Sequence, residues 1–196
     1  MDYHATGLAP ELEIAQWLNT DAPITLQSLR GKVIVVHAFQ MLCPGCVAHG
    51  LPQAAAIRAT FDERDVAALG LHSVFEHHAV MTPQALKAFV YEYRLDFPIG
   101  IDKPGTSGPI PRTMQAYGLR GTPSLLLIDR MGRLRLNHFG RIDDMRLGAL
   151  VAQLVAEPGA GAQAGAASPS TAPVESSRPG DAVCDGNACA VAGCGT

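Results

Sequence analysis

Apolar residues occur early in the chain as a short continuous run followed by a stripe at helical spacing. The run at 33–39 is apolar except for His37, which predicts a strand buried on both faces. The stripe at 47–61 predicts a helix, which Pro52 should interrupt because proline has no backbone N–H group. A strand that leads directly into a helix is typical of the first unit of an α/β fold.

The later pattern continues the alternation of strands and helices. A short hairpin or loose strands are expected over 1–30, where Asn19-Thr20-Asp21 and Pro23 indicate a turn. The remaining predicted elements are, in order, a strand at 66–75, a helix that starts at Thr82-Pro83, a strand at 97–101, a short helix at 112–117, a hairpin of strands at 124–128 and 134–139, and a helix capped by Asp143 or Asp144. This order predicts an α/β fold with a central mixed sheet and helices on both faces.

The composition changes after residue 156. Ala, Gly, Pro and Ser dominate 157–183 and large apolar residues nearly disappear, so this stretch cannot bury a core and is expected to be a disordered linker. The tail at 184–196 contains three of the five cysteines of the chain. We therefore predict a folded domain at 1–156, a linker at 157–183 and a cysteine-rich tail at 184–196.

The overall composition argues against several classes of protein. Hydrophobic residues make up 47% and charged residues 17% of the 196 positions, which is enough apolar content for one sizeable core. The net charge of −3 gives no argument for nucleic acid or a membrane as partner, and no apolar run is long enough to span a bilayer. Residues 1–5 lack the features of a signal peptide, which predicts a cytoplasmic location, or a periplasmic one if a leader has been removed.

Two cysteines separated by two residues lie where the first buried strand meets its helix. In Cys43-Pro44-Gly45-Cys46, the first cysteine would lie beside the unpaired amides of the helix N-terminus, which favour a thiolate. Pro44 would occupy the first helical position, where its missing N–H costs nothing. The second thiol would lie one turn away, near enough to close a small disulfide ring. The motif therefore predicts a redox-active dithiol rather than two structural cysteines or half of a zinc site.

Three stretches of the chain together resemble the thioredoxin fold. They are the lead-in at 26–33, the dithiol region at 39–46, and Gly121-Thr122-Pro123 with the hairpin that follows it to residue 132. The closer likeness is to the redoxin branch, which contains TlpA-like thiol-disulfide oxidoreductases and the related AhpC/TSA group. The resemblance extends over residues 8–156 and leaves out the linker and the tail.

The resemblance implies roles for three residues of this chain. Cys43 would be the nucleophile that attacks a substrate disulfide and forms a mixed disulfide, and Cys46 would be the thiol that resolves it. Pro123 would form a cis bond and lie against the dithiol, where the neighbouring backbone can pair with an extended substrate. No cofactor is expected for this chemistry.

Three positions depart from the pattern of the family. Leu42 stands where the family usually has tryptophan, and His37 takes the place of a buried aspartate of thioredoxins. His37 is either a base that accepts the proton of Cys46 during resolution, or a strand histidine whose ring is hydrogen-bonded in the core. Gln40 occupies the position where a peroxiredoxin has threonine or serine, which argues against direct reduction of peroxides.

Other histidines and cysteines have more than one interpretation. His49 follows Cys46 by nearly one helical turn and is either close to the dithiol, as a neighbour or a metal ligand, or a residue of the helix surface. Glu76-His77-His78 suggests either a metal site or a solvated loop. The tail cysteines Cys184, Cys189 and Cys194 are a second thiol pair that exchanges with the dithiol, a thiolate site for Cu(I) or Zn(II), or part of a dispensable terminus.

The sequence as a whole predicts a thiol-disulfide oxidoreductase that cycles its Cys-Pro-Gly-Cys motif on protein disulfides. The expected partners are a protein disulfide substrate and a thioredoxin-reductase-type or other dithiol electron donor. Two alternatives are a thiol peroxidase with an antioxidant role and a copper- or zinc-binding protein on the same fold. The sequence leaves open whether the dithiol reduces or oxidises its substrate.

Overall fold

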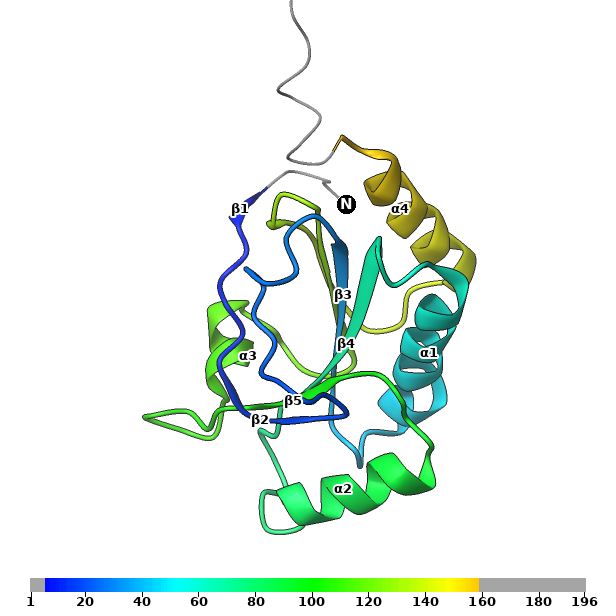
Figure 1. Cartoon of the computed structure of the whole chain (residues 1–196). Coiled ribbons are helices and arrows are strands. Elements are labelled where there is room, and N and C mark those ends of the chain that lie inside the picture. The colour runs from blue at the N-terminus through cyan, green and yellow to red at the C-terminus, as the bar shows by residue number, and fades with distance from the viewer. Residues whose placement is uncertain (1–5, 159–196) are drawn as a thin grey trace, which may run out of the picture. The chain divides into compact units, whose positions relative to one another are not determined.

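Seven strands within residues 6–158, the part of the chain that the computed structural model describes, form one mixed sheet in the order β1-β7-β6-β3-β4-β5-β2 (Figure 1). They are β1 (Thr6–Leu8), β2 (Ile14–Leu18), β3 (Val33–Phe39), β4 (Val66–His72), β5 (Ile99–Asp102), β6 (Ser124–Ile128) and β7 (Arg133–Phe139). The central strand β3 runs parallel to β4 and antiparallel to β6. The prediction of a mixed sheet in an α/β fold is confirmed.

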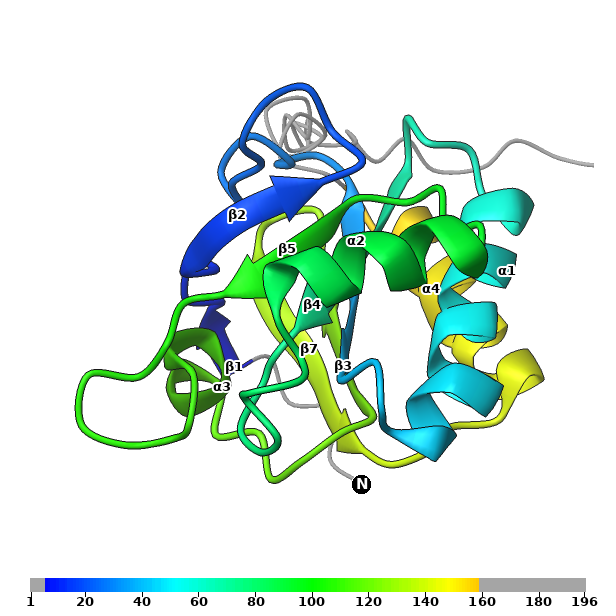
Figure 2. The same cartoon turned by 90° about the horizontal axis from the view of Figure 1, so that it is seen from below.

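Helices cover both faces of this sheet. They are η1 (Cys46–Gly50), α1 (Leu51–Thr60), α2 (Pro83–Glu92), α3 (Arg112–Ala116) and α4 (Asp144–Ala156). Helices α1, α2 and α4 lie on one face, whereas α3 lies on the other (Figure 2). The prediction of helices on both faces is therefore confirmed.

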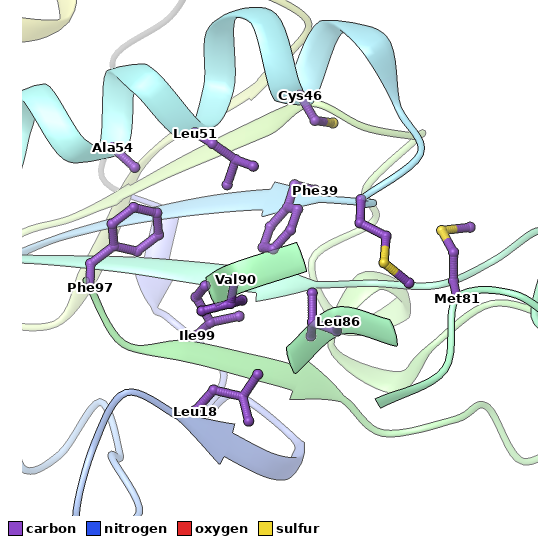
Figure 3. Close-up of a cluster of buried hydrophobic side chains, with 11 residues drawn as sticks. Leu18, Phe39, Cys46, Leu51, Ala54, Met81, Leu86, Val90, Phe97 and Ile99 are labelled. Carbon is purple, nitrogen blue, oxygen red and sulfur yellow. The ribbon is translucent and has the colours of Figure 1, made fainter. Parts of the chain in front are cut away.

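Alternate residues of β3 face the two helix layers, which explains why the whole strand is buried. Its odd-numbered valines pack with α1 and α4, whereas its even-numbered residues pack with Met114 of α3 and neighbouring side chains. At the end of the strand, Phe39 lies below Cys46 in the core that α1 and α2 share (Figure 3). His37 is also odd-numbered, so it shares the face that carries the dithiol.

Pro52 interrupts the helix that follows the dithiol, as predicted. The nitrogen of Pro52 carries no hydrogen, so the carbonyl one turn before it cannot receive its usual helical bond. The preceding turn, η1, is π-helical, and the N–H of Leu51 bonds to the carbonyl of Cys46, five residues earlier. The helix thereby continues into α1 with a wider turn at its start.

Two predicted helix starts are confirmed by side-chain caps. The Thr82 side chain accepts a hydrogen bond from the N–H of Ala85 at the start of α2, and Pro83 follows as the first helical residue. At the start of α4 the cap is Asp143, which accepts from the N–H of Arg146. Asp144 is therefore the first residue of the helix rather than its cap.

The N-terminal segment differs from a hairpin. β1 pairs with β7 and β2 pairs with β5, so the two strands lie at opposite edges of the sheet. The loose-strand interpretation is correct and the hairpin interpretation is wrong. The apolar pieces of this segment are short, and their partners are distant strands that a local pattern does not identify.

Two strands are shorter than predicted, and side chains supply hydrogen bonds beyond the end of the first of them. The expected strand at 66–75 ends at His72. Beyond it, the Ser73 hydroxyl donates to Asp102, and the N–H of Phe75 donates to the side chain of Gln40. The expected strand at 97–101 begins only at Ile99.

The predicted linker from residue 159 onward and the cysteine-rich tail lie outside the described residues. At the end of the described range, the carboxylate of Glu157 bonds to the guanidinium of Arg135 on β7. Within residues 6–158, no helix combines the length and the apolar character that crossing a bilayer requires.

Candidate active site

Cys43 occupies the turn that joins β3 to the dithiol helix. The N–H groups of Cys46 and Val47 both donate to the carbonyl of Cys43, each at 3.1 Å, so the helical turn starts directly after it. The N–H of Cys46 also points at the Cys43 sulfur, with a nitrogen–sulfur distance of 3.3 Å. Pro44 lies in the first turn, where its missing donor needs no partner. The structure therefore places Cys43 at the helix N-terminus, as the sequence predicts.

The two thiols of the motif lie side by side but differ in exposure. Their Sγ atoms are 2.6 Å apart, and both are free thiols in the structure. Cys43 is half-buried, whereas Cys46 is fully buried. Burial and the hydrogen bond to Cys43 raise the pKa of Cys46 to about 12. A substrate therefore meets Cys43 first, while Cys46 is covered and protonated at neutral pH.

Pro123 lies against the dithiol helix although it is distant in sequence. The Thr122–Pro123 bond is cis, and the Thr122 carbonyl accepts a hydrogen bond from the Cys43 thiol at 3.5 Å. A Cβ atom on Gly45 would lie 3.4 Å from the Pro123 ring, and one on Gly50 would lie 3.5 Å from it. The predicted cis bond and the predicted position beside the dithiol are confirmed. The role of Pro123 in catalysis stays a prediction.

His37 is buried with one ring nitrogen unpaired. The side chain is 3% exposed, and its Nε2 has no hydrogen-bond partner among the described residues. Burial lowers the pKa of His37 to about 4, so the ring is neutral at neutral pH. At Nε2 the structure lacks the hydrogen bond that a purely structural core histidine would need. The ring therefore keeps one buried nitrogen without a hydrogen-bond partner among the described residues.

Two buried histidines are expected to make the fold sensitive to acid. His72 resembles His37: it is 1% exposed, and burial lowers its pKa to about 4 from an ordinary value of 6.5. The unfolded chain binds these protons below pH 6.5, whereas the folded chain resists them until about pH 4. The free energy of unfolding should therefore be constant above pH 6.5 with respect to these groups, and fall by roughly 3 kcal/mol per histidine toward pH 4.

Urea unfolding at a series of pH values measures this fall. In a His37→Leu chain, the fall in the free energy of unfolding that the two histidines cause should be about half as large, since only His72 still titrates. Two stability curves that stay parallel from pH 7 to 4 would show that His37 does not resist protonation in the fold.

A groove of about 380 Å³ opens beside Cys43. Its walls come from the dithiol turn, from the loop between β4 and α2, and from residues that flank Pro123 in sequence and in space. Three of its apolar side chains are largely exposed: Leu42 at 57%, Val80 at 58% and Phe139 at 46%. The guanidinium carbon of Arg120 lies over the Phe139 ring, 5.3 Å from the ring centroid. The accessible cysteine is thus surrounded by an apolar rim, defined here as Leu42, Val80 and Phe139.

Gln40 connects the dithiol strand to one wall of this groove. Its side chain is buried; Oε1 accepts from the N–H of Phe75, and Nε2 donates to the Glu76 carboxylate, both at 3.2 Å. The sequence singled out Gln40 only because it replaces the threonine or serine of a peroxidase. In the structure, the hydrogen bonds of its side chain stabilise the loop that contains Glu76 and Val80.

The other sequence candidates lie at the surface. His49 is exposed on the dithiol helix, in agreement with the surface interpretation. Glu76, His77 and His78 are exposed in the loop at the edge of the groove, in agreement with a solvated loop. Within residues 6–158, no three acidic, histidine or cysteine side chains come together in a metal-binding arrangement. The tail cysteines lie outside the described residues.

The sequence did not identify the apolar rim. Val80 precedes a capped helix and Phe139 ends a predicted strand, so each was an ordinary apolar position of its element. A signal that could have identified them is an apolar residue at one end of a helix or strand. That end must lie at the same edge of the sheet as the end of β3. Only the sheet order shows that these positions meet at Cys43.

The fold, the dithiol at a helix N-terminus and the adjacent cis proline define the class of thioredoxin-like thiol-disulfide oxidoreductases, and the chain is an enzyme of this class. Its residues 7–137 match the model of the AhpC/TSA family. The chain belongs to this family, as its resemblance to the redoxin branch predicted.

Similar proteins agree with this class. A crystal structure of a thioredoxin-like superfamily protein is 60% identical, with a TM-score of 0.76, and the match covers 78% of this chain and 98% of that one. A thiol-disulfide isomerase from Corynebacterium glutamicum is 51% identical, with a TM-score of 0.73, over 76% of this chain and 98% of its own. Protein DipZ of Mycobacterium bovis is 30% identical over 158 residues, which are 78% of this chain but 22% of DipZ.

Proposed function

We propose that the chain exchanges dithiol and disulfide with protein substrates through Cys43 and Cys46. The observation that carries this proposal is the contrast within the motif: Cys43 opens to the groove, and Cys46 lies buried with its sulfur 2.6 Å away. The first thiol can therefore react with a large partner. The second thiol is held where it reaches the first but is covered from the partner.

The proposed cycle, written for reduction of a substrate, balances without a cofactor. The Cys43 thiolate attacks one sulfur of the substrate disulfide, and the other sulfur leaves as a thiolate that takes up a proton. Cys46 then loses its proton and attacks Cys43, so that the Cys43–Cys46 disulfide forms and the second substrate sulfur leaves. Two electrons have passed from the dithiol to the substrate. A dithiol donor, such as a protein of the thioredoxin-reductase type, returns two electrons and two protons.

His37 is proposed as the acceptor of the Cys46 proton. It lies on the face of β3 that carries the dithiol helix, it is neutral, and its Nε2 has no partner among the described residues. The high pKa of Cys46 means that this thiol must give up its proton before it can attack, and the lowered pKa of His37 makes its ring a weak base that would hold this proton only briefly. Pro123 is proposed to present the adjacent backbone to an extended substrate segment beside Cys43.

The groove favours protein disulfides over small ones as substrates. Its apolar rim is open to solvent, and apolar side chains around a reactive thiol gain free energy when a partner covers them. The thiol peroxidase alternative gains no support, because Gln40 is occupied with the Phe75–Glu76 loop. The cytoplasmic location and the alternative periplasmic location both remain predictions.

A Phe139→Ala chain tests whether the rim binds the substrate. The KM for a protein disulfide should rise about tenfold, since a contact with one aromatic ring is worth 1.5–3 kcal/mol when fully buried and less at a rim. The rate with a small disulfide such as oxidised glutathione should stay the same. Steady-state kinetics with both substrates measures the difference.

Met145→Ala is the matched control for this variant. Met145 is 85% exposed on α4 and does not line the groove, so its loss should change neither KM. Equal KM values for Phe139→Ala and the unchanged chain on a protein disulfide would remove the rim from the substrate-binding surface.

A further inference from the structure

The groove beside Cys43 contains one carboxylate, that of Glu76. Among the described residues that line the groove, Glu76 is the only acidic one, and none is a lysine or an arginine. The residue is exposed, and none of the ion pairs within residues 6–158 involves it. The negative charge at this edge of the groove therefore has no cation from the described part of the chain to balance it.

Hydrogen bonds from one buried residue, Gln40, fix the carboxylate relative to the reactive cysteine. Nε2 of Gln40 donates to one carboxylate oxygen of Glu76, and Oε1 of Gln40 accepts from the N–H of Phe75, both at 3.2 Å. The carbonyl of Gln40 also accepts from the N–H of Cys43 at 3.0 Å. A carboxylate has room for several hydrogen bonds, so Glu76 can still accept one from a partner in the groove.

The surroundings of this carboxylate suit a long side chain with a cationic head. Leu42 and Val80, two members of the apolar rim, line the same groove and are largely exposed. Lysine and arginine place their methylene stems on apolar surface while the charged head reaches a polar group. A head that donates to Glu76 would form a charge-assisted hydrogen bond, which is stronger than a neutral one. An acidic side chain at the same place would be repelled.

The other charge near the groove, that of Arg120, lies on the opposite side of Cys43. Its guanidinium lies over the ring of Phe139, which ends β7, whereas Glu76 follows β4. Strands β6 and β3 separate β7 from β4, so the two strand ends are three strand spacings apart, roughly 14 Å. Exposed charges at this separation are largely screened from each other, since the Debye length in physiological salt is about 8 Å.

We propose that Glu76 is a specificity-determining residue, which selects protein disulfides that have a lysine or an arginine beside the reactive cysteine. The inference rests on the proposed function, in which Cys43 attacks a protein disulfide. The carboxylate binds the cationic head of the substrate side chain, and the apolar rim covers its stem. The chain should therefore react faster with basic substrate segments than with acidic ones.

Glu76→Gln removes the charge and keeps the shape of the side chain. The amide oxygen of glutamine can still accept the hydrogen bond that the carboxylate receives. Glu63→Gln is the matched control, because Glu63 is also an exposed glutamate and does not line the groove. The carbonyl of Asp65 in the same loop accepts from the N–H of Val33, which starts β3, so this loop lies at the end of the strand away from Cys43.

The test measures how fast the reduced, full chain reacts with synthetic disulfide peptides. The peptides differ only at one position beside the cysteine, which is lysine, glutamine or glutamate, and one series varies each side. Single-turnover reactions at low ionic strength are stopped with acid, and the reduced peptide is quantified by chromatography. The reactions are run at pH 8, above the usual titration range of histidine, because His77 and His78 follow Glu76 in the sequence.

The expected result is a ratio of rates, which does not depend on a uniform change in activity. The unchanged chain and Glu63→Gln should prefer the lysine peptide to the glutamate peptide by about fivefold in at least one series. This is the size expected for one exposed ion pair together with the corresponding repulsion. In Glu76→Gln the ratio should fall to about one.

Charge reversal and salt provide two further measurements. Glu76→Lys should reverse the preference, so that the glutamate peptide reacts faster than the lysine peptide. Salt at about 1 M should bring the ratio of the unchanged chain close to one, since the Debye length then falls to about 3 Å.

Two results would overturn the inference. One is equal rates for the lysine and glutamate peptides in both series with the unchanged chain. The other is a preference for lysine that Glu76→Gln retains. A failure of the proposed dithiol cycle would look different, because the chain would then reduce none of the peptides, whatever their charge, and the proposed specificity would be lost with it.

Discussion

A Cys43→Ser chain is expected to lose turnover of protein disulfides by more than about a thousandfold. The serine hydroxyl does not ionise near neutral pH and cannot exchange with a disulfide, whereas the thiolate is the attacking species in this chemistry. Cys46 cannot replace Cys43, because it is fully buried and its pKa is raised to about 12. The loss should therefore appear in the first chemical step, before any mixed disulfide forms.

Reduction of an insulin-type protein disulfide, followed with a dithiol donor present, measures this loss. The thermal midpoint of the variant should stay close to that of the unchanged chain, because serine differs from cysteine by one atom. One outcome would contradict the assignment: turnover that survives in Cys43→Ser and disappears only when Cys184, Cys189 and Cys194 are also replaced. That result would make the tail cysteines the nucleophiles.

A Cys46→Ser chain is expected to stop after one reaction and keep its substrate bound. Cys43 remains free to attack, but the thiol that lies 2.6 Å behind it and resolves the intermediate is gone. The mixed disulfide should approach one substrate per chain, and steady-state turnover should fall by at least about a hundredfold. The cause is the geometry of the buried pair, which leaves Cys43 without a second thiol among the described residues.

Mass spectrometry of tryptic peptides shows where the substrate is held. Cys43 and Cys46 fall in the peptide 33–58, and the three tail cysteines fall in the peptide 147–196. The substrate should be attached to 33–58 in Cys46→Ser and to neither peptide in Cys43→Ser, the matched control. A disulfide between 33–58 and 147–196 in place of the trapped substrate would instead support exchange with the tail.

Local signals in the sequence were sufficient for the elements that build the dithiol site. The apolar run at 33–39, the proline after Cys43 and the caps at Thr82 and Asp143 each act within a few residues, so the pattern predicts them directly. Pro52 is a further case, since the loss of one N–H group is enough to alter the turn before it. The cis bond before Pro123 came from the family resemblance rather than from the local pattern.

Features that depend on distant partners were not predictable in the same way. β1 and β2 lie at opposite edges of the sheet because each pairs with a strand that is far along the chain. Gln40 holds Phe75 and Glu76 across two strand ends, and Phe139 reaches Cys43 from the end of β7. The unpaired nitrogen of His37 is visible only when its surroundings are known. In each case the decisive quantity is a contact between elements, which a single sequence does not encode locally.

The most direct test of the dithiol cycle is one stoichiometric reaction of the reduced, full chain with a protein disulfide. We expect peptide 33–58 to lose the mass of two hydrogen atoms, one substrate disulfide to be reduced for each chain, and peptide 147–196 to stay unchanged. Reduction of the substrate with peptide 33–58 unchanged would contradict the assignment of Cys43 and Cys46 as the exchanging pair.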